Sequence, residues 1–229
     1  MERMISPHNP AAAAPRRPVL CTSLAGYDYR DCRQVAAQSE MAEIRIDTMT
    51  LAVEQTEELF QPAPVPLIAA CRAGKMPDAR REQHLRTAIH AGAAYVDVEI
   101  DAPYKERLLR DARTHGSKVI LSYHHFDGTP PSGVLQTLVR QMRAWNPDVL
   151  KIVPYARSST DSLRVLALYE TEPNLLAFCM GAAGRFSRIA AGLLGAPFVY
   201  AFPDNGKPSA DGQLSVSQLK TLFRILHTE

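Results

Sequence analysis

Residues 94–122 read AYVDVEIDAPYKERLLRDARTHGSKVILS, and this stretch decides the fold class. The apolar runs at its two ends, Ala94–Ile100 and Ser117–Ser122, carry Val, Ile or Leu on both faces, which is typical of parallel strands covered by helices. The segment between them, Pro103–Thr114, has the amphipathic pattern of a helix. A strand, a helix and a second strand in this order predict an α/β protein with a parallel sheet.

The same unit repeats on both sides of this stretch, and eight such units predict a single (β/α)8 TIM barrel, which is a fold of about this length. An open doubly wound sheet also alternates strands and helices, but the first loop, Leu24–Asp28, carries no GxGxxG motif. We expect strands at Pro18–Ser23, Ala42–Asp47, Pro66–Cys71, Ala94–Ile100, Ser117–Ser122, Val149–Val153, Leu175–Met180 and Pro197–Phe202. We expect helices at Asp28–Gln38, Leu51–Phe60, Asp78–Ala91, Pro103–Thr114, Pro130–Trp145, Thr160–Glu170, Arg185–Leu194 and Ser215–His227.

The composition limits the possible classes of protein. The 229 residues are 46% apolar and 22% charged, which fits a globular chain with a substantial core. We expect residues 1–17 to be a flexible tail and residues 18–229 to be one catalytic barrel domain. The balance of 26 basic and 24 acidic side chains argues against nucleic acid or an anionic membrane as the partner.

The chain also carries no sign of export. No apolar run approaches the roughly 20 residues that cross a bilayer, and we see no apolar region of the signal-peptide kind. The cysteines are scattered without the spacing that zinc ligands or a disulfide framework need; they are Cys21, Cys32, Cys71 and Cys179. We therefore expect a cytoplasmic protein.

Polar side chains gather where the expected strands end, and this is where such barrels place their chemistry. Alternation puts Glu43, Arg45 and Asp47 on one face of the second strand, although these three could simply form an internal ion-pair network. The other polar residues at or after strand ends are Arg72, Asp97, Glu99, His124, Lys151, Arg188, Ser209 and Gln213.

Lys151 is the most informative of these residues. It lies in an apolar run between Leu150 and Ile152, so we expect burial to disfavour its ammonium form. A neutral amine is a nucleophile toward carbonyl groups. The alternative is a structural ion pair of Lys151 with Asp97 or Glu99.

His124 ends the strand before Lys151 and has the right chemistry to carry a proton, although it could also merely cap the strand. Alternation directs its neighbour His125 out of the pocket. Arg188, near the start of the seventh helix, suits a carboxylate, unless it is a solvated surface arginine. No metal-ligand spacing such as HExxH is present.

Taken together, these motifs resemble type I 3-dehydroquinate dehydratase, a Schiff-base enzyme family of the shikimate pathway. The resemblance runs from about Val19 to the C-terminus and is strongest after Ala94. It rests on residues 43–47, 95–99, 122–126, 129–130, 150–152, 180–181, 187–188 and 212–213, in this order at the ends of consecutive strands.

The resemblance implies an imine between Lys151 and the ring ketone of 3-dehydroquinate, with His124 as general acid and base. It implies that Arg188 holds the substrate carboxylate. The other substrate-binding residues that it implies are Ser23, Glu43, Arg45, Arg72, Ser209 and Gln213. It also implies a homodimer, a small anionic substrate and no cofactor, with residues 209–214 as a lid.

The sequence departs from the family after the third-strand arginine. The family usually carries Glu-Gly-Gly there, and that glutamate orients the catalytic histidine, whereas this chain has Met76 at the position. Asp78 and Glu99 are the candidates to replace it. His125 and Asp211 also differ from the usual residues, which are aspartate or asparagine and proline.

Two other functions are compatible with these residues. A Schiff-base aldolase would use the same lysine, but the Gly-rich phosphate loop that such an enzyme needs is missing after the last two strands. A catalytically inactive barrel kept as a binding module would account for Met76.

Overall fold

The computed structural model describes residues 17–74 and 76–226. Apart from Arg17, the predicted tail lies outside the described residues, and so does His227 at the end of the predicted last helix. Within the described ranges, no helix has the length and apolar character that a membrane span requires.

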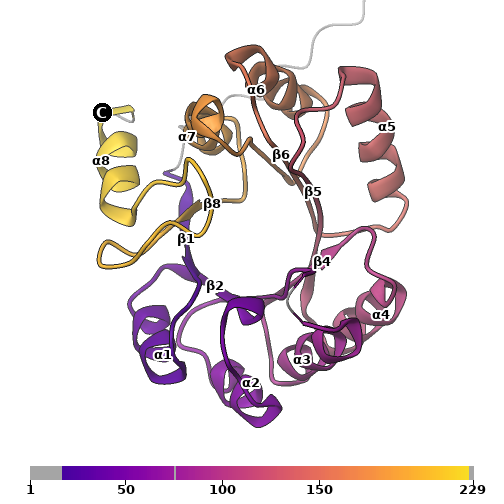
Figure 1. The fold of residues 1–229 in the computed structure, drawn as a ribbon, viewed down its shortest axis with the longest axis vertical. Helices are drawn as coiled ribbons and strands as arrows, with labels where there is room; N and C mark the ends of the chain where they lie inside the picture. Colours follow the sequence, from indigo (N-terminus) through magenta and orange to yellow (C-terminus); the bar gives the residue numbers. More distant parts are fainter. Residues whose placement is uncertain (1–16, 75, 227–229) are drawn as a thin grey trace, which may run out of the picture.

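Eight parallel strands form a ring at the centre of the molecule and confirm the predicted barrel (Figure 1). They pair in the order β7-β6-β5-β4-β3-β2-β1-β8, and no ladder joins β7 to β8 in the described part of the chain, so the barrel is nearly closed. The strands are β1 (Val19–Leu24), β2 (Met41–Arg45), β3 (Leu67–Ala70), β4 (Tyr95–Glu99), β5 (Lys118–His125), β6 (Val149–Pro154), β7 (Leu175–Ala177) and β8 (Phe198–Ala201).

The helices lie outside the ring, and each strand is followed by one (Figure 1). They are α1 (Tyr29–Ala37), α2 (Val53–Phe60), α3 (Asp78–His90), α4 (Lys105–His115), α5 (Ser132–Arg143), α6 (Ser159–Leu166), α7 (Arg185–Leu193) and α8 (Val216–Leu226). Capping side chains begin two of them, because Asp28 accepts a hydrogen bond from the Asp31 N–H and Ser158 accepts one from the Asp161 N–H.

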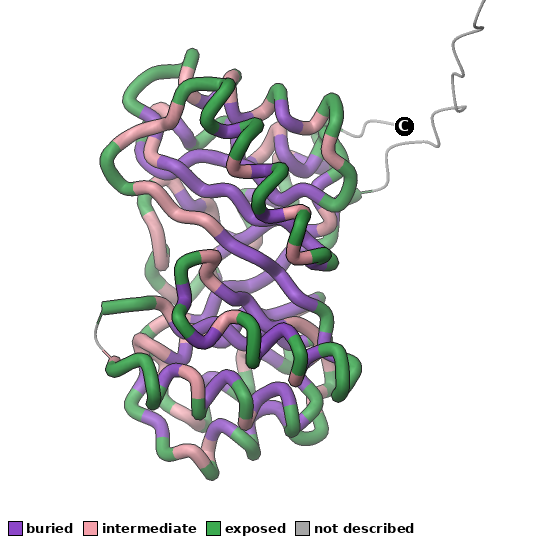
Figure 2. Tube along the Cα trace, turned by 90° about the vertical axis from the view of Figure 1, so that its right-hand side faces the viewer, coloured by how far each residue is buried: buried purple, intermediate pink, exposed green. Residues whose placement is uncertain are grey.

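Two apolar layers hold the barrel together. The larger one lies between strands and helices, and the second fills the inside of the ring. Figure 2 shows the result, with buried strands in the middle and exposed residues on the outer faces of the helices. The inner layer comes from alternate strand positions, among them Met41, Ile68, Ile120, Val149, Leu176, Phe198 and Tyr200. This packed floor leaves the space for a ligand at the carboxyl ends of the strands.

Every strand ends at least one residue away from its predicted end, and β7 stops three residues early, at Ala177. Two of these differences, in β2 and β5, have a clear physical cause. β2 stops at Arg45, because the Asp47 carboxylate accepts hydrogen bonds from the Arg72 N–H and the Arg45 guanidinium and bends residues 46–48 into the 3₁₀ turn η1 (Ile46–Thr48). β5 continues past Ser122 to His125, because β6 pairs with it along that whole length. Both changes affect side chains at the open end of the barrel.

Candidate active site

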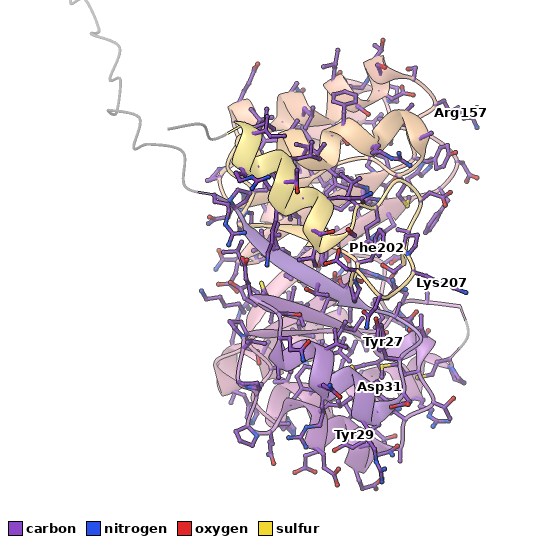
Figure 3. The ribbon with its side chains drawn as sticks, turned by 90° about the vertical axis from the view of Figure 1, so that its left-hand side faces the viewer. Tyr27, Tyr29, Asp31, Arg157, Phe202 and Lys207 are labelled. Atoms are coloured by element: carbon purple, nitrogen blue, oxygen red, sulfur yellow. The ribbon has the colours of Figure 1, made fainter. Side chains whose placement is uncertain are left out.

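A cavity of about 620 Å³ opens at the carboxyl ends of the strands. At this end the β8–α8 loop with Lys207 lies near Tyr27 of the β1–α1 loop (Figure 3). His125 is not among the residues that line the cavity, as alternation predicts. The structure brings together all nine side chains predicted for the site, which are Ser23, Glu43, Arg45, Arg72, His124, Lys151, Arg188, Ser209 and Gln213.

Lys151 lies on β6, lines the cavity and is only 4% exposed. Its Nζ donates hydrogen bonds to Asp97 Oδ2 (2.9 Å), the Tyr200 hydroxyl (3.0 Å) and Glu43 Oε1 (3.4 Å). Burial is confirmed, but the expected apolar surroundings are not found, since two buried carboxylates lie beside the Nζ atom. The ion-pair alternative was right for Asp97 and wrong for Glu99, whose expected position is taken by Glu43.

Asp97 is the centre of this ion-pair network. The Arg72 guanidinium donates to both of its carboxylate oxygens (3.0 and 2.6 Å), and the Ser122 hydroxyl donates to one of them (2.6 Å). Burial alone would raise the pKa of Asp97, but Arg72 and Lys151 outweigh burial and hold that pKa well below its usual range. Asp97 therefore stays ionised and compensates two cations of the cavity.

Glu43 connects Lys151 to the loop that follows β8. The Ser23 hydroxyl donates to Glu43 Oε2 (2.8 Å), and the Ser209 hydroxyl donates to Ser23 (3.1 Å). Burial acts to raise the pKa of Glu43, but Lys151 and Arg45 lower it below its ordinary value. A continuous line of hydrogen bonds thus runs from the β8–α8 loop to the lysine.

The predicted lid, residues 209–214, lies against the barrel. Both the N–H and the hydroxyl of Ser209 donate to Gln213 Oε1 (2.8 and 3.0 Å). Gly212 has φ of 76°, and a Cβ there would lie 2.7 Å from the Gly181 carbonyl oxygen. Only glycine therefore allows the loop to pack so closely beside the seventh strand.

Arg188 on α7 is 3% exposed, so the alternative of a solvated surface arginine is wrong. Its guanidinium lies over the Phe178 ring (4.5 Å to the centroid) and donates to the Asp211 carbonyl oxygen (3.0 Å). In the described residues its buried Nε has no hydrogen-bond partner, and no carboxylate forms an ion pair with it. Burial lowers the pKa of Arg188 to about 10. The cavity therefore contains a buried cation that lacks an anion.

The other three cations that line the cavity are paired with carboxylates in the described structure. All four cations therefore line one cavity. Pairing leaves only Arg188 with its charge uncompensated. The three paired residues and their partners are Arg45 with Asp47, Arg72 with Asp97, and Lys151 with Asp97 and Glu43.

His124 lies near the end of β5, two residues beyond the Ser122 that pairs with Lys151 in the ladder. Burial, then Arg72 and Lys151, lower the pKa of His124 well below 6.5. The imidazole is therefore neutral at pH 7 and can accept a proton. Its buried Nδ1 has no hydrogen-bond partner within the described residues.

Neither candidate for the missing glutamate contacts His124. Asp78 pairs with Arg81 (2.7 Å), and Glu99 pairs with the same guanidinium. Met76 stands where the family has the glutamate, and its thioether cannot replace a carboxylate as a strong hydrogen-bond acceptor. In this chain the histidine is therefore placed by its strand and by packing, without a carboxylate partner among the described residues.

Sequence reasoning missed several further side chains that line the cavity, and three of them contact charged residues of the site. These three are Ser122, Phe178 and Tyr200. The signal that could have found them is alternation, because each has the same parity as a neighbour that faces inward: Ser122 with His124, and Tyr200 with Phe198.

The arrangement places three chemical functions around one cavity. Lys151 provides a primary amine that can add to a carbonyl, and His124 provides a neutral imidazole that can move a proton. Arg188 provides a cation for a carboxylate. Among the described residues, no group of three or more His, Cys, Asp or Glu side chains is placed to hold a metal ion.

Comparison with known proteins identifies the family of this chain. A family model described as Type I 3-dehydroquinase matches residues 20–229. A 3-dehydroquinate dehydratase of Thermococcus onnurineus is 37% identical over 196 residues, which cover 83% of this chain and 89% of that protein. One of Thermococcus gammatolerans is 44% identical over 152 residues, covering 66% and 70%.

A solved structure shares the barrel fold of this chain. The crystal structure of 3-dehydroquinate dehydratase from Geobacillus kaustophilus superposes with a TM-score of 0.81 at 24% identity, covering 92% of this chain and 91% of that one. Since the family match extends over nearly all of the described barrel, the chain belongs to the type I 3-dehydroquinase family.

Proposed function

We propose that this protein removes water from 3-dehydroquinate through a Schiff base on Lys151 and releases 3-dehydroshikimate. The observation that carries the proposal is that Lys151, His124 and the unpaired cation Arg188 line one cavity. The substrate has a ketone for the amine and a carboxylate for the arginine. Relatives that are named 3-dehydroquinate dehydratase support this choice of substrate.

The substrate carboxylate binds to Arg188, with Ser209 and Gln213 beside it. A buried guanidinium with a free Nε gains a charge-assisted hydrogen bond and an anion when the substrate enters. The ring hydroxyls are held by the remaining polar side chains of the cavity, which are Ser23, Glu43, Arg45 and Arg72. Several fixed contacts leave the ketone in one orientation toward the amine.

The reaction conserves atoms over three steps. The Lys151 amine adds to the ketone, and one of its N–H protons moves to the former ketone oxygen. His124 then returns the proton that it took from the ammonium, so the oxygen leaves as water and an iminium ion forms. The iminium withdraws electrons from the adjacent C–H bond, so His124 takes that proton while the electron pair forms a C=C bond and expels the hydroxyl group. His124 returns its proton to this hydroxyl, which leaves as water. One water then hydrolyses the imine, and the net change is loss of one water.

The lysine must lose a proton before it can add to the ketone. Asp97 and Glu43 hold the ammonium in the free protein, whereas the neutral His124 can accept a proton. The same histidine therefore serves imine formation as well as elimination.

Reduction with borohydride in the presence of 3-dehydroquinate tests the proposal directly. We expect mass mapping to find the reduced adduct on the peptide that contains Lys151 and on no other. The exposed Lys118 and Lys220 serve as internal controls for random labelling. A wild-type protein that turns over substrate without any adduct at Lys151 would refute the Schiff-base route. If the wild-type protein gives no adduct and no turnover, the alternative of a catalytically inactive barrel is favoured.

Replacement of Arg188 by glutamine is expected to raise KM roughly 100-fold, with a much smaller change in kcat, because charge-assisted hydrogen bonds to the carboxylate are lost. The melting temperature should stay the same or rise, since the variant removes a buried cation that has no carboxylate partner in the described structure. Steady-state kinetics and thermal unfolding check both results.

Arg185→Gln is the matched control for this variant, because Arg185 begins the same helix but is exposed. It should change neither KM nor the melting temperature. An unaltered KM in Arg188→Gln would show that the carboxylate binds elsewhere.

We also propose that the protein acts as a homodimer in the cytoplasm. The homodimer is supported by the resemblance to the family, and the location by the four cysteines, which are all free in the described structure, as a reducing compartment would keep them. Sedimentation equilibrium would give the mass of two chains if the first part is right, and the mass of one chain would contradict it.

A further inference from the structure

Tyr200 makes a direct contact with Lys151 that none of the proposed steps uses. It lies on β8, faces the inside of the barrel and is 5% exposed. Its hydroxyl oxygen accepts a hydrogen bond from Lys151 Nζ (3.0 Å), and its ring centroid is 4.3 Å from the same nitrogen. The tyrosine therefore touches the ammonium both through its hydroxyl and through the face of its ring.

The hydroxyl completes the surroundings of the lysine nitrogen. An ammonium group has three hydrogens, and three oxygens accept them, from Asp97, Glu43 and Tyr200. Two of these acceptors are carboxylates that can only accept and that hold the proton on the nitrogen. Tyr200 is the neutral one, and a hydroxyl group can both accept and donate.

The phenol keeps its proton under working conditions. Burial first, and then the charges of Glu43, Cys21 and Asp97, raise the pKa of Tyr200 well above 10. When Lys151 loses a proton, its nitrogen has two hydrogens and a lone pair, and the tyrosine hydroxyl can turn and donate to that lone pair. Tyr200 can thus stay bonded to the nitrogen in both protonation states, although the bond to the charged ammonium is the stronger of the two.

We propose that the Tyr200 hydroxyl is a positioning group for Lys151, which holds Nζ in place while the ammonium becomes the reactive amine. This inference rests on the proposed Schiff-base function. It explains how the Lys151 side chain keeps its orientation when Nζ loses one of the protons that it donates to Asp97 and Glu43. If the amine moved away, it would no longer be oriented toward the ketone, and this loss of orientation would slow the addition.

Tyr200→Phe tests this role, because it removes the hydroxyl and keeps the ring over the nitrogen. The readout is the rate of borohydride-trapped imine at Lys151 as a function of pH, with 3-dehydroquinate as the probe. We expect the plateau rate to fall about 10- to 100-fold, which is the worth of a hydrogen bond to a charged group. We also expect the pH of half-maximal rate to fall by about one unit, since a bond that favours the ammonium is lost.

Tyr169→Phe is the matched control. Tyr169 is a tyrosine whose hydroxyl bonds to the backbone of Ala177 on β7, and it does not line the cavity. Its loss should lower the melting temperature but leave the pH of half-maximal trapping unchanged. A merely structural role for Tyr200 would give the same pattern as this control.

The outcomes separate the two proposals. Trapping in the wild type with an unchanged plateau and midpoint in Tyr200→Phe would overturn the positioning role and leave the Schiff base standing. A lower plateau with an unchanged midpoint would also overturn it, because poor folding alone produces that result. Turnover of substrate by the wild type with no trapping at Lys151 would overturn both proposals.

Discussion

Replacing Lys151 with arginine is expected to lower kcat by about 10⁴-fold or more, because the guanidinium keeps the charge but cannot form an imine. Arginine can still pair with Asp97 and Glu43, so the melting temperature should change little. Borohydride with 3-dehydroquinate should leave residue 151 unmodified. The measurements are kcat, peptide mass mapping and thermal unfolding of the same sample.

Lys151→Ala separates the chemical role of the lysine from its electrostatic role. It should be as inactive as Lys151→Arg but less stable, by about 3–5 kcal/mol, because it leaves buried carboxylates without a cation. Asp97 retains Arg72, so Glu43 bears most of this cost. Turnover close to the wild-type rate with Lys151→Arg would show that the lysine acts by its charge and that no Schiff base is required.

The pH dependence of this instability follows from the sign of the shift at Glu43. In the wild type Lys151 lowers the pKa of Glu43, so the pair contributes stability above the unfolded pKa of about 4.3, and this is lost as the pH falls through the folded pKa. In Lys151→Ala the lysine no longer opposes the effect of burial, so the pKa of Glu43 is higher than in the wild type. Protonation of Glu43 then removes the buried charge that destabilises the variant. The difference in melting temperature between wild type and variant should therefore shrink as the pH falls from 7 toward 4.

The fold and the membership of the site were readable from the sequence because both follow from short-range rules. Apolar runs such as Val149–Val153 are covered on both faces and predict parallel strands, and alternation assigns each side chain to the inside or the outside. Parallel strands bring their carboxyl ends to one end of a barrel, so Glu43, Lys151 and Arg188 had to meet.

The pairing of charges could not be read in the same way. It depends on which side chains face each other across the barrel, and alternation along one strand does not give that distance. Lys151 was expected among apolar neighbours because Leu150 and Ile152 adjoin it in sequence, yet these point outward while Glu43 and Asp97 approach from other strands. The contact with Tyr200 was missed for the same reason, since 49 residues separate the two.

Replacing His124 with alanine is expected to leave the imine at Lys151 trappable and to lower kcat by about 10²- to 10⁴-fold, which is the usual contribution of a general acid and base. Trapping should be slower than in the wild type but should reach the same final extent. His125→Ala is the matched control, since its ring bonds to the Gly128 carbonyl oxygen (2.9 Å) and does not line the cavity. That variant should keep most of its activity.

The pH profile gives a second test of the same histidine. Burial and the nearby cations Arg72 and Lys151 keep the pKa of His124 well below 6.5, so its neutral, proton-accepting form persists as the pH falls below the ordinary value. The acid limb of the elimination step, followed in a single turnover after the imine has formed and Lys151 has already lost its proton, should therefore lie below pH 6.5 in the wild type. It should disappear in His124→Ala, whose residual rate no longer depends on this group. In the described structure the buried Nδ1 of His124 has no hydrogen-bond partner. The nearby charge of Asp97 acts to raise the pKa of His124, but burial and the cations outweigh it. An acid limb above pH 6.5, or full turnover in His124→Ala, would place the proton carrier on another residue.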